Sequence, residues 1–106
     1  MSLSAKARRA KGIRGEREVR LILEEFNFDV RGLEGGGDHI ATKGRVGELL
    51  ALHVESKWQE RLQVHQWWEQ CVAETPEGML PVLAYRRSGE EWKAVVRLKD
   101  LLELIS

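Results

Sequence analysis

A strand-length run at residues 49–58 constrains the fold more than any other part of the chain. It begins with four apolar residues and continues as HVESKW. Because successive side chains of a strand point to opposite faces, one face is apolar and suits the core, and the other carries His53, Glu55 and Lys57. Burying charge is costly unless it is paired or binds a metal. The run therefore predicts either a simple Glu55–Lys57 pair on an edge strand or a functional site at the end of a buried strand.

Size and composition narrow the class of protein. The 106 residues suit one small domain with one core. No apolar run approaches the length of a membrane span, and the basic N-terminus lacks the apolar centre of a signal peptide. Cys71 is the only cysteine, so no internal disulfide can form and a reducing compartment fits. We therefore expect a cytoplasmic protein with no membrane partner, in which Cys71 is a small buried side chain on a helix.

The basic residues are gathered at the N-terminus. The net charge is zero, but the first twenty residues hold seven basic and two acidic side chains, a net charge of +5, which leaves −5 for the remainder. Residues 1–11 are small and basic without apolar periodicity, and we expect a flexible arm there that is disordered or loosely helical. A basic arm on an otherwise acidic domain suits a polyanion such as nucleic acid. A solvated tail would have the same composition.

Apolar periodicity and turn signals predict an α/β fold of the mixed α+β type. The expected elements are a helix at about 13–27, strands at about 28–31, 38–42 and 49–57, a helix at 62–74, strands at 80–85 and 92–97, and a helix at 98–105. The first three strands can form an antiparallel meander with turns at 33–37 and 43–48. The second helix can then return the fourth strand, in parallel, alongside the neighbour of the third. Three glycines in the first of these turns suit a mobile loop or a close approach to a ligand.

Each predicted helix has an apolar stripe that we expect to be buried. The stripes are Val19, Ile22, Leu23 and Phe26; Val64, Trp67, Trp68, Cys71 and Val72; and Leu101, Leu102 and Ile105. Two adjacent indoles cannot easily face one core, so one of the pair at 67 and 68 is a candidate for a dimer interface, where tryptophan is enriched. His53 shares the face of Glu55 and is a candidate substrate contact.

Three acids and one lysine could converge if the second and third strands are neighbours. Asp38 opens the second strand, Glu55 and Lys57 end the third, and Glu16 lies on the first helix. Carboxylate oxygens are the ligands that Mg²⁺ and Mn²⁺ prefer, and a backbone carbonyl at Ser56 and waters could complete such a site. A lysine beside it could hold the attacking water or neutralise developing charge. These groups suit hydrolysis of a phosphodiester.

At this point the sequence resembles the PD-(D/E)xK nuclease superfamily and, within it, the Holliday-junction resolvases of archaea and phages. The resemblance extends from about Lys11 to Arg97. The motifs that carry it are Lys11-Gly12-x-x-Gly15-Glu16-Arg17-Glu18, Gly36-Gly37-Asp38, Val54-Glu55-Ser56-Lys57, Gln70, and Pro81-Val82-Leu83-Ala84. Their order and spacing together are more specific than any one of them.

The resemblance implies one nuclease domain over residues 1–106 with a restriction-endonuclease-like core, a helix–three strands–helix–two strands–helix order, and a Mg²⁺ cofactor that Mn²⁺ can replace. The implied catalytic residues are Glu16, Asp38, Glu55, Lys57 and Gln70. The implied metal ligands are Asp38, Glu55, the backbone carbonyl of Ser56, and Glu16 directly or through water. The implied DNA-binding residues are Arg8, Arg9, Lys11, Arg14 and Arg17. The implied partners are a DNA four-way junction and a second copy of the chain, in a prokaryotic or phage-infected cell.

The chain departs from the resolvase pattern in the loop before Asp38. Gly37 stands where a proline is usual, and the loop has none of the serines that archaeal resolvases often carry there. This bears on junction specificity more than on nuclease activity. Two alternatives therefore remain: a nuclease of the same superfamily that acts on a flap, nick, mismatch or duplex, and a DNA-binding module that has lost catalysis.

Overall fold

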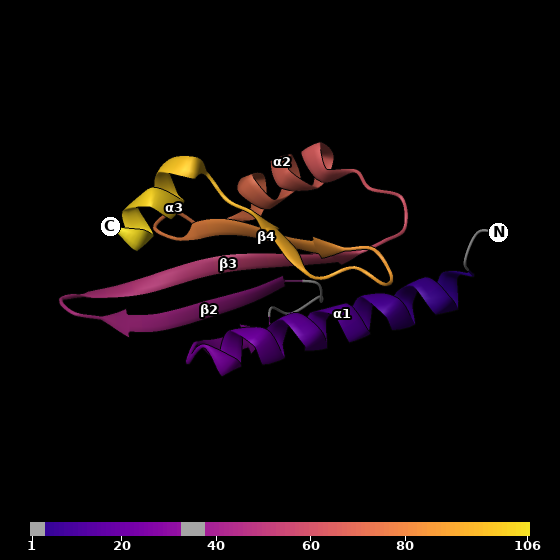
Figure 1. The fold of residues 1–106 in the computed structure, drawn as a ribbon, viewed down its shortest axis with the longest axis horizontal. Helices are drawn as coiled ribbons and strands as arrows, with labels where there is room; N and C mark the ends of the chain where they lie inside the picture. Colours follow the sequence, from indigo (N-terminus) through magenta and orange to yellow (C-terminus); the bar gives the residue numbers. More distant parts are fainter. Residues whose placement is uncertain (1–3, 33–37) are drawn as a thin grey trace.

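Five strands form one mixed sheet in a computed structural model that describes residues 4–32 and 38–106. The elements are α1 (Ala5–Glu25), β1 (Asp29–Gly32), β2 (Asp38–Arg45), β3 (Glu48–Trp58), α2 (Val64–Glu74), β4 (Leu80–Arg86), β5 (Lys93–Val95) and α3 (Leu98–Ile105), shown in Figure 1. The spatial order of the strands is β1-β2-β3-β4-β5. The predicted fold class and element order are confirmed. The predicted glycine loop at 33–37 lies outside the described residues.

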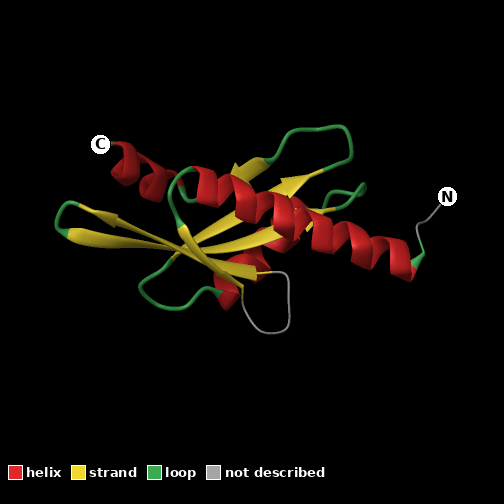
Figure 2. Cartoon of the chain, turned by 90° about the horizontal axis from the view of Figure 1, so that it is seen from below, coloured by secondary structure: helices red, strands yellow, loops and turns green. Residues whose placement is uncertain are grey.

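The sheet has a helix on each face. α1 crosses one face, as Figure 2 shows, and α2 lies on the other (Figure 1). On the α1 face, Val19 packs in one buried cluster with Leu52 and Val54. On the α2 face, Trp67 and Cys71 pack with Leu83. Because both faces of β3 are covered, the strand is buried without interruption over 52–55, and its polar side chains face a helix rather than solvent.

Strand pairing brings the ends of β2 and β3 together. They are antiparallel with Asp38 opposite Glu55, and opposite residues of a pair share a face. β4 runs parallel to β3 and pairs with it directly. The prediction that placed the fourth strand beside the neighbour of the third is wrong. β2 already occupies one edge of β3, so the crossover through α2 reaches its open edge.

The N-terminal helix begins at Ala5, eight residues before the predicted start. The Ser4 hydroxyl accepts a hydrogen bond from the Ala7 N–H and caps the helix. Alanine, lysine and arginine are strong helix formers, so a basic segment without an apolar stripe is still helical. The part of the predicted arm at 5–11 is therefore ordered, and Asn27, with φ of 68°, ends the first helical segment as expected.

The hairpin between β2 and β3 is tighter than predicted. Both strands continue through the segment assigned to a turn, to Arg45 and from Glu48. Only Val46 and Gly47 connect them, and Gly47 has φ of +79°. Two-residue hairpin loops need positive φ values that glycine adopts without strain.

Burial confirms some residues of the predicted apolar stripes and contradicts others. On α1, Val19 is buried and Leu23 packs on the core, but Ile22 and Phe26 are 40% and 62% exposed. Only a narrow row of α1 side chains, spaced i, i+4, contacts the sheet, and the α1 residues beside this row are exposed to solvent. Cys71 is buried as predicted, and burial together with the nearby Glu55 carboxylate raises the pKa of its thiol to about 11.

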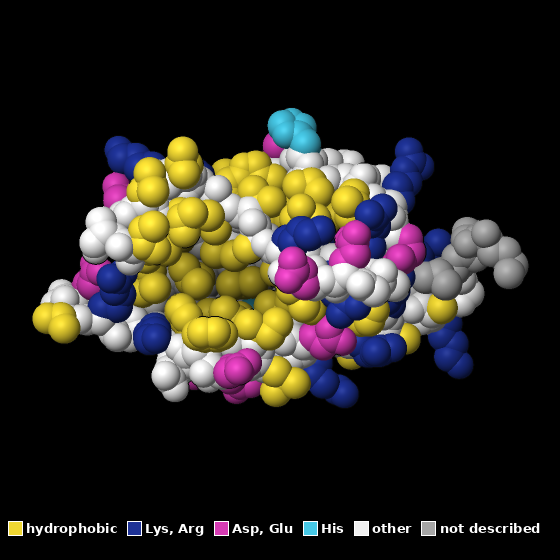
Figure 3. Space-filling view, viewed as in Figure 1, with side chains coloured by type: hydrophobic (Ala, Val, Ile, Leu, Met, Phe, Trp, Pro, Cys, Tyr) yellow, Lys and Arg dark blue, Asp and Glu magenta, His cyan; other side chains and the backbone are white. Residues whose placement is uncertain are grey.

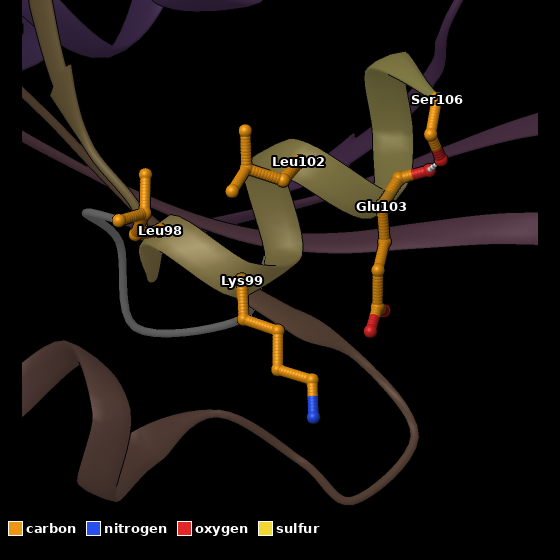
Figure 4. A pocket seen from close by; sticks show the side chains of 5 residues that line it. All are labelled: Leu98, Lys99, Leu102, Glu103 and Ser106. Atoms are coloured by element: carbon orange, nitrogen blue, oxygen red, sulfur yellow. Dashed lines mark hydrogen bonds between the residues drawn. The ribbon is translucent and has the colours of Figure 1, made fainter.

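The last helix exposes its apolar stripe instead of burying it. Apolar side chains gather over α3 in Figure 3, and those of large exposure are Leu98, Leu101, Leu102 and Ile105. A shallow pocket there is lined by Leu98, Lys99, Leu102, Glu103 and Ser106, as drawn in Figure 4. Arg45 donates to the Leu104 carbonyl, which places α3 near the β2–β3 hairpin and away from the Asp38 end of β2. Within the described part of the chain, none of the helices has the length and apolar character needed to cross a membrane.

Candidate metal centre

Three carboxylates from three elements meet on the α2 face of the sheet. Asp38 opens β2, Glu55 lies opposite it on β3, and Glu74 is the last residue of α2. One carboxylate oxygen of each lies within 4.8 Å of the others. The convergence of Asp38 with Glu55 agrees with the prediction. Glu74 was not predicted, because only the packing of α2 over β3 brings its side chain to this place.

Glu55 is the most deeply buried acid of the group. Its side chain is 4% exposed, and Oε1 lies 3.3 Å from Nζ of Lys57. Oε2 is buried and has no hydrogen-bond partner among the described residues. Burial raises the pKa of the Glu55 carboxyl, Lys57 opposes this rise, and the charges of Asp38 and Glu74 add to it. A buried acceptor without a partner is unfavourable, and it marks a position that a cation would satisfy.

Asp38 is held by a histidine beneath it. Its Oδ2 lies 3.0 Å from Nε2 of His53, and Nδ1 of His53 lies 3.0 Å from the Thr75 hydroxyl. Burial raises the pKa of the Asp38 carboxyl; the charge of His53 lowers it and that of Glu74 raises it. His53 is 1% exposed, so the expectation that it contacts substrate is wrong. α2 covers this face of β3 and therefore buries the imidazole.

The predicted glutamine lies on the outer side of the same group. Gln70 donates from Nε2 to Oε1 of Glu74 at 3.0 Å, one helical turn later on α2. Residues at i and i+4 of a helix are neighbours, so Gln70 orients the third carboxylate. Gln70 thus contacts the acidic group through Glu74, an acid that no sequence pattern singles out.

Glu16 lies elsewhere. It is on α1, which covers the opposite face of the sheet, and it acts electrostatically on His39, a buried residue of that face. Burial lowers the pKa of His39, and the charge of Glu16 raises it. Among the described residues, the acidic group comprises Asp38, Glu55 and Glu74. Of the three acids and one lysine that were predicted to converge, the structure therefore brings together Asp38, Glu55 and Lys57. A catalytic role for Glu16 stays a prediction.

The donor set fits a hard divalent cation. Carboxylate oxygens from several elements around one point are the usual ligands of Mg²⁺ and Mn²⁺, and the buried Oε2 of Glu55 needs a partner. Asp38, Glu55 and Glu74 could hold such an ion, with the backbone carbonyl of Ser56 as the further ligand that the resemblance implies. Lys57 lies against Glu55 at the open end of β3, with its side chain 24% exposed.

The basic residues predicted to bind DNA divide into two groups. Arg8, Arg9 and Arg17 are exposed on α1. Figure 3 shows Lys and Arg side chains around the end of the molecule where α1 begins. Lys11 pairs with Glu60 and lies over the ring of Trp58.

Arg14 lies over the same ring, 5.1 Å from its centroid. The guanidinium of Arg86 lies over it from β4 at 4.3 Å. Such cation–aromatic contacts are favourable, so Trp58 packs α1 against the sheet, and Lys11 and Arg14 contribute to that packing. Gly15 permits the close approach, since a Cβ there would lie 3.3 Å from the Trp92 ring.

Replacing Glu55 by glutamine is expected to stabilise the metal-free protein at pH 8 by about 1–3 kcal/mol, because a buried carboxylate charge has a larger desolvation cost than a neutral amide. A raised native pKa means that folding favours the protonated carboxyl. The stability that Glu55 contributes below its unfolded pKa is therefore lost as the pH rises through its native pKa. The advantage of the Glu55→Gln variant should shrink from pH 8 to pH 4 in urea unfolding with EDTA.

Glu90→Gln is the control for this experiment, because its expected trend is opposite. A hydrogen bond from Arg87 lowers the pKa of Glu90 to about 2, so the carboxylate contributes stability above its unfolded pKa, and this is lost as the pH falls. This variant should be slightly less stable than the parent at pH 8, since solvent screens an exposed pair. An advantage of Glu55→Gln that does not vary with pH would contradict the assigned pKa shift.

The strand order and the helices on both faces of the sheet define a restriction-endonuclease-like fold. Among solved structures, the chain is similar to Hjc, a Holliday junction resolvase from the archaeal hyperthermophile Archaeoglobus fulgidus, with a TM-score of 0.64 and 24% identity. The match covers 81% of this chain and 72% of that one. No protein-family model matches the chain, and no curated protein matches its sequence. The chain thus has a Holliday-junction-resolvase-like fold, as the sequence resemblance implied.

Proposed function

We propose that the chain is a metal-dependent DNA endonuclease that hydrolyses phosphodiester bonds, and that its substrate is a Holliday junction. The observation that carries the proposal is the buried Oε2 of Glu55, which has no hydrogen-bond partner among the residues that the structure describes, although the Glu55 side chain lies beside Asp38, Glu74 and Lys57. Nothing in the packing of the sheet requires these four groups together. On a resolvase-like fold, they are the groups that phosphodiester hydrolysis requires.

The proposed mechanism assigns a role to each side chain of the group. Asp38 and Glu55 hold Mg²⁺, which Mn²⁺ can replace, together with Glu74 and the backbone carbonyl of Ser56. An ion held there would supply Lewis-acid stabilisation of the phosphate and would lower the pKa of a bound water. Lys57 holds the attacking water or neutralises the charge that develops on the phosphate. Gln70 keeps Glu74 in place through its hydrogen bond.

A second copy of the chain is part of the proposal. Resolving a four-way junction takes two cuts, and the described residues contain one carboxylate group of this kind. A homodimer would place two such sites on one junction. The exposed leucines of α3 form an apolar surface of a kind that often lies in contacts between proteins. Arg8, Arg9 and Arg17 would contact the phosphates of the arms, where Lys and Arg supply most of the affinity.

The experiment that tests the proposal is cleavage of a synthetic four-way junction with Mg²⁺, compared with linear duplex, flap and nicked DNA of the same sequence. Paired symmetrical nicks in the junction are the expected result and indicate two sites acting together. Cutting of flaps or duplex alone would keep the nuclease and overturn the junction as substrate. Binding without cutting, in Mg²⁺ and Mn²⁺ alike, would favour the inactive DNA-binding module.

Glutamine substitutions of Glu74 and Glu16 should separate the two candidates for the third carboxylate. Glu74 lies in the carboxylate group, and Glu16 acts on His39 from the other face. We expect Glu74→Gln to weaken Mn²⁺ binding about tenfold or more. Removing a residue that only supports a metal ligand commonly lowers metal affinity by about 10- to 100-fold, and removing a ligand itself should have at least this effect. Calorimetric titration of both variants with Mn²⁺ measures this directly. If Glu16→Gln alone loses metal affinity, Glu16 rather than Glu74 is the third carboxylate ligand.

A further inference from the structure

One hydrogen-bonded chain connects the end of α2 to the first residue of β2 through the interior of the protein. The Thr75 hydroxyl donates to the Cys71 carbonyl at 2.6 Å. Oγ1 of Thr75 lies 3.0 Å from Nδ1 of His53, and Nε2 of the same ring lies 3.0 Å from Oδ2 of Asp38. The imidazole is 1% exposed. Its two nitrogens therefore have these two oxygens as partners and little access to water.

Counting hydrogens fixes the direction of the chain. A threonine hydroxyl has one hydrogen, and at Thr75 it is directed to the Cys71 carbonyl. Oγ1 can therefore only accept from His53, so Nδ1 carries a hydrogen toward Thr75. Nε2 is then the nitrogen that faces Asp38, and because an ionised carboxylate only accepts, its hydrogen bond to Oδ2 requires a hydrogen on Nε2 as well. The hydroxyl thereby sets both the orientation of the ring and the identity of the nitrogen presented to the carboxylate.

The chain also controls which oxygen of Asp38 is available. Oδ2 is engaged with His53, so Oδ1 is the oxygen left for a cation. Rotation of the carboxylate would break the contact with a ring that is packed under α2 and cannot follow it. Thr75 immediately follows Glu74, so the same chain fixes the end of α2 from which the third carboxylate projects.

We propose that His53 and Thr75 are positioning residues that hold Asp38, and the α2 end bearing Glu74, in the geometry that binds the metal ion. This inference rests on the proposed metal-dependent function and adds residues from outside the carboxylate group. Neither residue touches the ion or the substrate. They act through Asp38, as the outer hydrogen-bond partners of metal ligands generally do.

The test measures Mn²⁺ binding by calorimetric titration of the full chain, at a temperature where each variant is folded. Thr75→Val removes the hydroxyl at nearly constant shape, and Thr75→Ser restores it. His53→Leu removes both hydrogen bonds of the ring. We expect Thr75→Val and His53→Leu to weaken Mn²⁺ binding by about 10- to 100-fold and Thr75→Ser to bind as the parent does. The control is His65→Leu, at an exposed histidine of α2, which should bind Mn²⁺ unchanged.

A double variant separates positioning from a loss of packing. If Thr75 acts through His53, then Thr75→Val should weaken binding no further once His53→Leu is present, because coupled residues are not additive. Additive losses, or a Thr75→Ser variant as weak as Thr75→Val, would overturn the relay. Should His53→Leu fail to fold, the comparison of the two Thr75 variants decides the matter.

Asp38→Asn distinguishes failure of the relay from failure of the metal centre. If this variant loses Mn²⁺ binding while Thr75→Val and His53→Leu bind as tightly as the parent, the centre stands and the relay is wrong. If Asp38→Asn binds Mn²⁺ as the parent does, or if the parent itself binds none, both the centre and the relay are overturned.

Discussion

Replacing Asp38 by asparagine is expected to abolish junction cleavage while leaving junction binding nearly unchanged. The carboxylate is one of the two central ligands of the proposed metal centre, and the amide is a far weaker ligand of nearly the same size. Metal-ion catalysis supplies several kcal/mol of transition-state stabilisation. At about 1.4 kcal/mol per factor of ten, its loss predicts a fall of about 10³-fold or more in the rate of cleavage.

Single-turnover cleavage and gel-shift binding of the same four-way junction measure the two effects separately. Binding should persist because it depends on Arg and Lys contacts to phosphates, and the exposed arginines of α1 are distant in sequence from the change. Asp29→Asn is the matched control, since Asp29 is an exposed acid on β1 and the substitution alters charge equally. Full cleavage by Asp38→Asn would remove Asp38 from the metal centre, and an equal loss in Asp29→Asn would attribute the effect to net charge.

Truncating Trp67 to alanine is expected to lower the free energy of unfolding by about 3–5 kcal/mol, the usual range for a large aromatic side chain in a core. The indole is 4% exposed and packs with Cys71 and Leu83 between α2 and the sheet. Its ring centroid lies 6.5 Å from that of Tyr85. A small domain has total stability of about 5–15 kcal/mol, so this loss is a large part of the whole.

Trp68→Ala is the natural comparison, because Trp68 is the adjacent indole and only partly buried. It should lower the unfolding free energy by less than half as much in urea denaturation. The two adjacent tryptophans in the sequence led to the expectation that one of them lies in a dimer interface. Because the Trp67 ring is inside the protomer, Trp68 is the residue to which that expectation applies, and its place in an interface stays a prediction. Equal losses in the two variants would contradict the assignment of Trp67 to the core.

Much of the fold was predictable because it rests on local patterns. The alternation along β3 and the apolar rows of α1 and α2 identify their elements, and turn residues separate them. The start of α1 was missed because residues 5–11 have strong helix propensity but no apolar row to reveal it. The place of β4 was missed because strand order depends on which edge of β3 is open, and no local pattern encodes this.

Only those residues of the candidate site whose positions depend on local sequence and on strand pairing could be predicted. Asp38, Glu55 and Lys57 follow from the ends of two adjacent strands. Glu74 and Thr75 are exposed or half-buried residues at the end of a helix, and their types are common there. Their positions beside Glu55 and His53 depend on how α2 packs across the sheet, which is a tertiary property.

The helical start of the chain changes how its basic residues can act. A flexible arm loses conformational entropy when it becomes ordered on a partner, whereas residues of a helix have already lost it on folding. In Figure 1, the first turns of α1 project beyond the strands, so Arg8 and Arg9 are carried on a stiff extension with a rise of about 1.5 Å per residue. Their positions are fixed relative to the carboxylates. The angle between a bound DNA arm and the scissile phosphate would then be set by the protein rather than by the DNA.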